Sequence, residues 1–249
     1  MRRFFLPETA FQPATTVELS PELLKHIRNV LRLNVGEDIE LLDGSGTIAR
    51  CRLNALSTKS GTALVLSTRV APSPPLIIEL IQGTAKGVKL DMVLQKGTEL
   101  GASRFILSAT ERSIGRLKEE RLTAKLERWK KITQEAARQC QQTHLPTISA
   151  TSSLTEAINN CHGQLKLMLW EEETQPLSLV LPDTPPKAIS VLVGPEGGLT
   201  SAEANVAKSA GFKSVRLGPR ILRTETAGLA IISILQYLYG DIAADISEE

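Results

Sequence analysis

The residues best suited to chemistry in this chain follow two short apolar runs near its C-terminal end. Ile189–Val193 leads into the glycine-rich loop Gly194–Gly198, and Val215–Leu217 leads into Gly218–Thr226, which carries two arginines, a glutamate and two threonines. An apolar run, a tight loop and a helical pattern, repeated, indicate parallel α/β units. Such sheets bind ligands at the carboxyl ends of their strands.

Glycine gives these loops their binding potential, because it allows a close backbone approach to a ligand. Backbone N–H and C=O groups there can bind an adenine edge without charged side chains. The alternative is that the glycines are ordinary turns and that the polar cluster caps a helix. The residues alone therefore favour a ligand site over ordinary turns and a helix cap.

The sequence does not contain the common motifs of other enzyme classes. The chain has no P-loop, no GxGxxG, no HExxH and no GxSxG pattern. Its three histidines stand beside no credible nucleophile, and Cys51, Cys140 and Cys161 form neither a disulfide framework nor a metal-ligand spacing. We expect no metal.

Charge is unevenly distributed along the 249 residues, although the net charge is only +2. Lys86–His144 holds 13 Lys/Arg against 7 Asp/Glu, whereas Leu145–Glu249 holds 7 against 12. This asymmetry favours a polyanionic partner, with a solvated mixed-charge helix as the alternative. No apolar run reaches the roughly 18 residues of a membrane span, and the N-terminus does not resemble a signal peptide. We expect a cytoplasmic protein without membrane contact.

Two domains are predicted. Residues 1–72 are β-rich, with a hairpin signal at Asp43–Gly46 and one helix at Pro21–Leu31. The Pro-rich stretch at 71–75 marks the boundary. In residues 73–249 strands and helices alternate, which predicts an α/β domain with a mainly parallel sheet. The principal helices are expected at 88–101, Glu119–Gln141 and Leu229–Tyr239.

Five blocks in order connect the chain to a known family. GPEGGLTSAE and LGPRILRTETAGLA together resemble the two signature blocks of the SPOUT methyltransferases. HIRNVLRLNVGEDIELLDGSG, QKGTELG followed by ERS, and QEAARQC resemble the remaining blocks of the bacterial ribosomal RNA small-subunit methyltransferase E family. Members of that family methylate N3 of a uridine in 16S rRNA.

The resemblance implies a trefoil-knotted SPOUT-type α/β methyltransferase domain behind a small PUA-like β-barrel RNA-binding domain. It also implies S-adenosylmethionine as methyl donor, RNA of the small ribosomal subunit as partner, and a homodimer formed through the methyltransferase domain. The implied donor-binding residues are Leu169, Trp170, Glu171, Val193, Gly194, Pro195, Glu196, Gly197, Gly198, Leu217, Gly218, Ile221, Leu222, Arg223, Thr224, Thr226 and Ala227.

Methylation at N3 needs an unpaired base that has lost its N3 proton. A cation near the uracil carbonyls would stabilise the developing anion, and Arg223 is the first candidate, with Arg220 second. Glu225 is the candidate to orient that arginine or to accept the proton. Capping of the final helix is the alternative role for Glu225.

Ten basic residues are the predicted RNA contacts: Arg2, Arg3, Arg28, Arg32, Lys86, Lys89, Lys96, Arg112, Arg116 and Arg138. Gln142 stands where the family often has an arginine, so one phosphate contact is expected to be missing. Two other functions stay open at this point. One is a SPOUT methyltransferase acting on another RNA position, and the other is a non-catalytic RNA-binding or ribosome-assembly factor.

Overall fold

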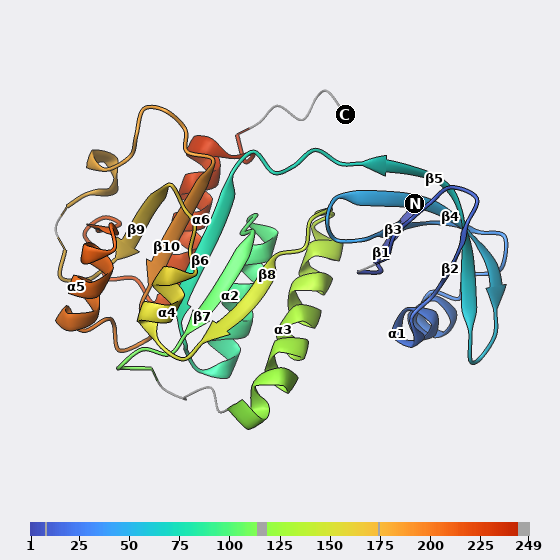
Figure 1. Ribbon diagram of the computed structural model, residues 1–249, viewed down its shortest axis with the longest axis horizontal. Coiled ribbons are helices and arrows are strands. Elements are labelled where there is room, and N and C mark those ends of the chain that lie inside the picture. Colours follow the sequence, from blue (N-terminus) through green and yellow to red (C-terminus); the bar gives the residue numbers. More distant parts are fainter. Residues whose placement is uncertain (8, 114–118, 174, 244–249) are drawn as a thin grey trace. The chain divides into compact units, whose positions relative to one another are not determined.

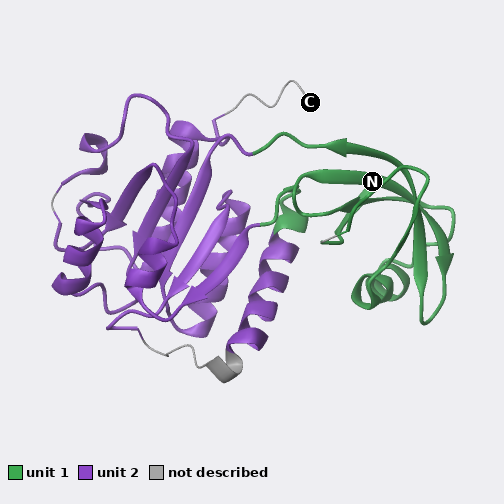
Figure 2. Cartoon of the chain, viewed as in Figure 1, with its two compact units in different colours: residues 1–73, 137–145 green, residues 74–136, 146–249 purple. Residues whose placement is uncertain are grey.

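Two compact units make up the chain in the computed structural model, which describes residues 1–7, 9–113, 119–173 and 175–243 (Figure 2). The first unit contains Met1–Ser73 together with Ala137–Leu145, and the second contains Pro74–Ala136 and Pro146–Glu249. The sequence had assigned Ala137–Leu145 to the second domain. These residues join the first unit because the fully buried Ala137 packs in one apolar cluster with Phe5, Leu42 and Ile48.

The first unit is a five-stranded sheet in the order β1-β3-β4-β5-β2, in which only β1 and β3 are parallel. Its elements are β1 (Arg2–Phe5), β2 (Thr16–Glu18), α1 (Pro21–Lys25), the π-helix η1 (His26–Val30), β3 (Asp38–Leu42), β4 (Thr47–Leu56) and β5 (Gly61–Val70). Ser20 caps α1 by accepting a hydrogen bond from Leu23 N. The single helix predicted over Pro21–Leu31 therefore changes to π geometry at His26.

The hairpin predicted at Asp43–Gly46 connects β3 to β4. Asp43 Oδ1 accepts hydrogen bonds from Ser45 N at 2.8 Å and from Thr47 N at 2.9 Å. Gly44 and Gly46 both have positive φ, which other residues adopt only with strain. Local side-chain bonding and glycine together fix this turn.

The second unit is a six-stranded parallel sheet in the order β11-β9-β10-β6-β7-β8 (Figure 1). Its elements are β6 (Ile77–Gly83), α2 (Gly87–Glu99), β7 (Arg104–Ser108), α3 (Glu119–Gln139), β8 (Thr147–Thr151), α4 (Leu154–Asn159), β9 (Leu165–Leu169), the 3-10 helix η2 (Leu177–Leu179), β10 (Ala188–Val193), α5 (Ser201–Ser209), β11 (Lys213–Val215) and α6 (Thr224–Tyr239). The predicted alternation of strands and helices is confirmed.

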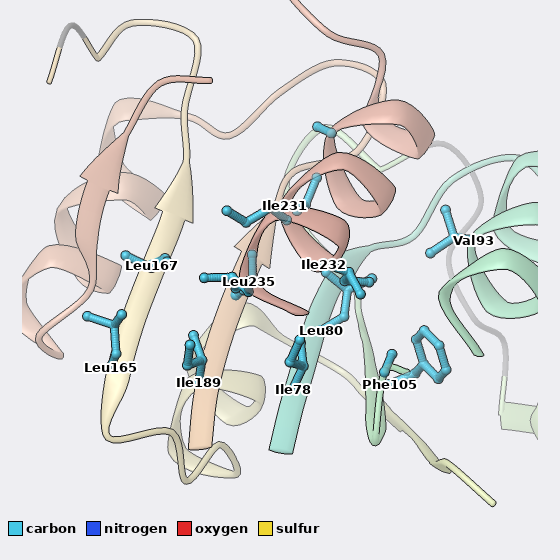
Figure 3. Packing of buried hydrophobic residues seen from close by; sticks show 14 of the residues in the cluster. Ile78, Leu80, Val93, Phe105, Leu165, Leu167, Ile189, Ile231, Ile232 and Leu235 are labelled. Atoms are coloured by element: carbon cyan, nitrogen blue, oxygen red, sulfur yellow. The ribbon is translucent and has the colours of Figure 1, made fainter. Parts of the chain in front are cut away.

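Both faces of this sheet are buried, and successive strand residues point to opposite faces. Ile78 and Leu80 of β6 pack in one cluster with Ile231 and Ile232 of α6 (Figure 3). Ile81 of the same strand instead belongs to the cluster that includes residues of α4 and α5. Each fully buried Ile or Leu contributes about 1.5–3 kcal/mol, so these two layers hold the strand ends in fixed positions.

Several element boundaries differ from prediction, among them those of α2, which spans Gly87–Glu99 instead of 88–101. β11 ends at Val215 rather than at Leu217, because the chain turns toward Gly218, whose φ is 74°. α3 ends at Gln139, two residues before Gln141, which has positive φ. α6 begins at Thr224, five residues before the predicted start, so the polar cluster belongs to its first turn. Among the helices of the described ranges, none is both long and apolar enough to cross a membrane.

Candidate active site

A cavity of about 750 Å³ lies at the carboxyl ends of three adjacent strands, β9, β10 and β11. Leu169, the last residue of β9, is paired in register with Val193 of β10 and with Val215 of β11. All three residues line the cavity. The parallel topology thus brings the two glycine-containing loops to one edge of the sheet, as expected for ligand sites in α/β folds.

Most of the residues predicted to bind a donor meet at this cavity. Of that set, only Gly218 and Thr226 do not line it. The cavity wall also includes four residues that were not predicted to bind the donor: Lys89, Val215, Arg216 and Arg220.

The Gly194–Gly198 loop is packed too closely to accept side chains. Gly198 has a φ of 70°, and a Cβ built there would overlap Glu171 Oε1. A Cβ at Gly194 would lie 3.1 Å from the carbonyl carbon of Gly198. The two glycines therefore let the loop fold against itself and against Glu171 while it forms one wall of the cavity.

A buried amide connects the two loops. Gln82, at the carboxyl end of β6, donates from Nε2 to Thr224 Oγ1 at 2.8 Å and lies 3.3 Å from Gly194 O. Thr224 in turn donates from Oγ1 to Gly194 O. Gln82 is fully buried, so these bonds are shielded from water. Sequence reasoning missed this residue, although a glutamine ending an apolar strand beside Gly83 was the available signal.

Lys89 lies between two carboxylates, one from the Gly194–Gly198 loop and one from the first turn of α6. Its Nζ is 3.6 Å from Glu196 Oε1 and 3.7 Å from Glu225 Oε2. Glu196 Oε1 also accepts a hydrogen bond from Lys86 N at 3.0 Å. Burial raises the pKa of the Glu196 carboxyl, but this hydrogen bond, the Glu196 backbone N–H and the Lys89 charge outweigh it and lower that pKa. Glu196 is therefore a carboxylate at neutral pH.

The two predicted catalytic residues, Arg223 and Glu225, lie in different environments. Arg223 is exposed, lines the cavity and occupies the N-cap position of α6. Glu225 does not line the cavity, and its Oε2 is buried without a hydrogen-bond partner. Arg220, the second arginine candidate, is exposed and lines the cavity as well. Two cations thus face the cavity from this loop.

In the first unit, three predicted RNA contacts line a second hollow: Arg2, Arg3 and Arg138. Arg3 is paired with Glu40 there, at 2.6 Å. Arg28 is half-buried and Arg32 is exposed, and neither lines that hollow.

In the second unit, the predicted RNA contacts have mixed surroundings. Arg112 donates from Nη1 to Gly197 O at 3.0 Å and so supports the glycine-rich loop. Lys96 pairs with Glu99 at 2.8 Å on the exposed side of α2. Lys86 is exposed, while Arg116 lies outside the described residues.

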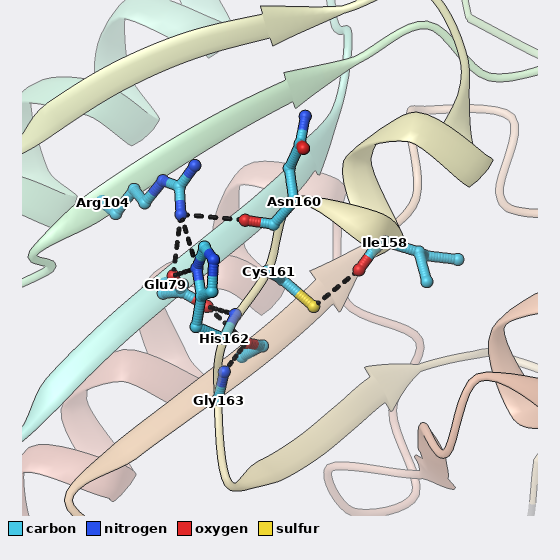
Figure 4. Close-up of polar contacts among 8 residues, drawn as sticks. Glu79, Arg104, Ile158, Asn160, Cys161, His162 and Gly163 are labelled. Carbon is cyan, nitrogen blue, oxygen red and sulfur yellow. Dashed lines mark hydrogen bonds and ion pairs between the residues drawn. The ribbon is translucent and has the colours of Figure 1, made fainter.

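At the opposite, amino-terminal end of the sheet, Glu79 is buried in a polar cluster (Figure 4). Its carboxylate accepts hydrogen bonds from Ser190 Oγ at 2.6 Å, His162 N at 2.7 Å and Arg104 Nη1 at 3.1 Å. Burial raises the pKa of Glu79, but these bonds outweigh burial and lower it below its ordinary value of 4.5. In the described ranges, no group of three or more His, Cys, Asp or Glu could hold a metal ion.

Two protein families match the chain along its length. A model of the RNA methyltransferase domain matches residues 72–236, and a model of the RNA methyltransferase PUA domain matches residues 19–66. Both agree with the predicted fold class, an α/β methyltransferase part preceded by a PUA-like part. The trefoil knot implied by the resemblance stays a prediction.

Similar proteins cover nearly the whole chain. A ribosomal RNA small subunit methyltransferase E from Bacillus subtilis is 34% identical, over 95% of this chain and 96% of the relative. The crystal structure of a protein of the same name from Neisseria gonorrhoeae, bound to S-adenosyl methionine, has a TM-score of 0.86 at 36% identity and covers 97% of this chain and 99% of that one. A putative methyltransferase from Legionella pneumophila, in complex with the same cofactor, has a TM-score of 0.88 at 32% identity, over 96% of this chain and 98% of that one.

Proposed function

Since this chain belongs to the ribosomal RNA small subunit methyltransferase E family, we propose that it transfers a methyl group from S-adenosylmethionine to N3 of a uridine in 16S ribosomal RNA. The observation that carries the proposal is the cavity at the ends of β9, β10 and β11, which gathers nearly all the residues expected to hold the donor. The cations Arg220 and Arg223 line the same cavity.

The cavity suits a nucleoside donor. Its volume of about 750 Å³ lies in the range typical of small-molecule sites. Loop backbone at Gly194–Gly198 and apolar side chains such as Leu169 and Leu222 form its walls. Trp170, which also lines it, has a buried Nε1 without a hydrogen-bond partner. When bound, the donor supplies an electrophilic methyl group on a sulfonium.

The protein's part in the reaction is to position the base and to stabilise its anion. The target base must leave any pairing before N3 is accessible. Arg223 lines the cavity, and in this proposal it faces a uracil carbonyl, where a cation stabilises the charge left when N3 loses its proton. Glu225 does not line the cavity, so in this proposal it acts through neighbouring groups rather than by touching the base.

RNA binding would rest on the basic residues of both units, which contact phosphates and provide affinity rather than sequence choice. The selection of one uridine would come from RNA shape and from the fit of the extruded base. We further propose that the small ribosomal subunit is the substrate particle. In this proposal the active enzyme is a homodimer formed through the methyltransferase domain.

The test is methylation of small ribosomal subunits and of naked rRNA, followed by mass spectrometric mapping of the modified nucleotide. We expect one methyl group, on uridine N3. A methyl group on ribose or on guanine would assign the chain a different RNA position. Calorimetric titration with S-adenosylmethionine is the companion measurement, since an absence of binding would favour a non-catalytic RNA-binding role.

A further inference from the structure

Lys89 lies between two carboxylates, an arrangement that a general role in RNA binding does not explain. It comes from α2, whereas the carboxylates beside it come from Glu196 in the glycine-rich loop and from Glu225 in the first turn of α6. Lys89 lines the cavity, and its side chain is 35% exposed. A substrate in the cavity can therefore reach it. A role for Lys89 in catalysis rests on the proposed function.

The two carboxylates position this ammonium group and can occupy at most two of its three N–H donors. The Nζ–oxygen distances of 3.6 and 3.7 Å give electrostatic attraction but exceed hydrogen-bond length. Lys89 thus retains donors for a third acceptor in the cavity. Lys96, on the same helix, differs because its Nζ donates to both oxygens of Glu99, at 2.8 and 2.9 Å.

Charge explains why the ammonium stays in place. One lysine lies within 4 Å of two carboxylates, and electrostatic attraction to both holds its ammonium group between them. Glu196 Oε2 and Glu225 Oε2 are both buried and lack hydrogen-bond partners. The buried carboxylates therefore need a nearby cation, and Lys89 is the lysine within 4 Å of both.

We propose that Lys89 is a catalytic residue that donates a hydrogen bond to a carbonyl oxygen of the target uracil, while Glu196 and Glu225 position it. When N3 releases its proton to water, the negative charge spreads over O2 and O4, which flank N3. Two cations then face two oxygens, Lys89 on one and Arg223 on the other. The contact strengthens as charge develops, so it acts on the transition state more than on substrate binding.

Two other roles for Lys89 predict different measurements. If Lys89 only connected the loops, its loss would lower the melting temperature and weaken S-adenosylmethionine binding, with the pH profile of kcat unchanged. If it contacted RNA phosphate, its loss would raise KM for RNA and reduce the salt dependence of binding. A contact with the ionising base instead predicts lower kcat, with RNA affinity and its salt dependence retained.

The experiment compares Lys89→Met and Lys89→Arg with the wild type in the full-length protein, using small ribosomal subunits as substrate. We expect Lys89→Met to lower kcat about 100-fold near pH 7, as for other lost oxyanion donors, and to leave S-adenosylmethionine affinity within about threefold. The deficit should shrink as pH rises, because uracil N3 then loses its proton more readily without help. Lys89→Arg should recover part of the loss.

Lys130→Met is the matched control, because Lys130 pairs with Glu127 on an exposed face of α3. It should behave as the wild type. Glu225→Gln keeps the size of the side chain and removes one of the two charges beside Lys89, so its kcat should also fall, by about tenfold.

A wild-type kcat and pH profile in Lys89→Met would overturn the inference and leave the proposed function intact. A loss confined to KM for RNA, or to S-adenosylmethionine affinity, would overturn it too. Failure of the wild type to methylate any RNA would instead remove the proposed function.

Discussion

Carboxylates with buried oxygen atoms occur at both ends of the parallel sheet, and they differ in the number of hydrogen bonds that they accept. At the amino-terminal end, Glu79 accepts hydrogen bonds from Ser190, His162 and Arg104 (Figure 4). At the carboxyl end, Glu225 is only partly buried, but its Oε2 atom is buried and has no hydrogen bond, with Lys89 Nζ at 3.7 Å.

This difference in hydrogen bonding indicates that one carboxylate stabilises the fold and that the other takes part in the chemistry of the site. A buried carboxylate whose oxygens are saturated by fixed donors stabilises the fold, and removing it leaves those donors unpaired. A carboxylate that is not saturated raises the energy of the folded state, and such groups concentrate where a ligand completes the site. We therefore expect stability to depend on Glu79 and reactivity to depend on the residues around the cavity.

The largest expected effect is on stability. Glu79→Ala leaves Arg104 and Ser190 without their buried acceptor, so the free energy of unfolding should fall by about 3–5 kcal/mol, measured by denaturant titration. Glu127→Ala is the control, because Glu127 forms an exposed pair with Lys130 and should cost at most about 1 kcal/mol. Equal losses in the two variants would remove the distinction between the ends of the sheet.

Activity should respond most strongly to Arg223. Arg223→Ala is expected to reduce kcat about 100- to 1,000-fold, as for other lost oxyanion donors. The free energy of unfolding should stay nearly unchanged, because the side chain is exposed. Calorimetry should show that S-adenosylmethionine still binds. Turnover at the wild-type level would exclude Arg223 from the mechanism.

A smaller effect is expected at the glycine-rich loop. Gly198→Ala introduces a Cβ that overlaps Glu171 Oε1 at a φ of 70°, so S-adenosylmethionine affinity should fall by about tenfold or more through local strain. Gly211→Ala is the control, since Gly211 also has positive φ but nothing lies within 4 Å of the added atom. That variant should lose some stability and retain affinity. Equal affinities in both would show that the close packing is not needed for binding.

The smallest effect is a pH dependence. The folded-state pKa of Glu79 is lowered, so its contribution to stability is fully present above the unfolded value of 4.5 and is lost as pH falls through the folded value. The difference in unfolding free energy between the wild type and Glu79→Gln should therefore narrow as pH falls below 4.5. A difference that stayed constant down to about pH 3 would show that ionisation of Glu79 is not its source.

The sequence predicted what depends on local pattern. Alternating apolar runs and helical spacing identified the parallel α/β unit, and the glycines after two apolar runs marked the loops that meet at the cavity. The resemblance supplied the chemistry that periodicity cannot give. Local pattern was less reliable at element ends, as at Leu229, where α6 had already begun five residues earlier.

What the sequence did not show depends on contacts between distant positions. Gln82 binds Thr224, 142 residues away, and Ser190 binds Glu79 across 111 residues. No local spacing encodes such pairs. The available signal was a polar residue inside an otherwise apolar strand, as with Glu79 and Gln82 in β6, since such residues are buried only with partners.

The grouping of Ala137–Leu145 with the first unit has a consequence for dissecting the chain. Phe5, Leu42 and Ile48 share their apolar cluster with Ala137, which comes from the end of α3, and Leu145 also packs against it. A fragment cut after Ser73 would keep every strand of the first sheet but expose that cluster to water. We therefore expect it to aggregate, whereas the same fragment joined through a short linker to residues 137–145 should stay monomeric. The first unit is thus one compact body formed by two separate segments of the sequence.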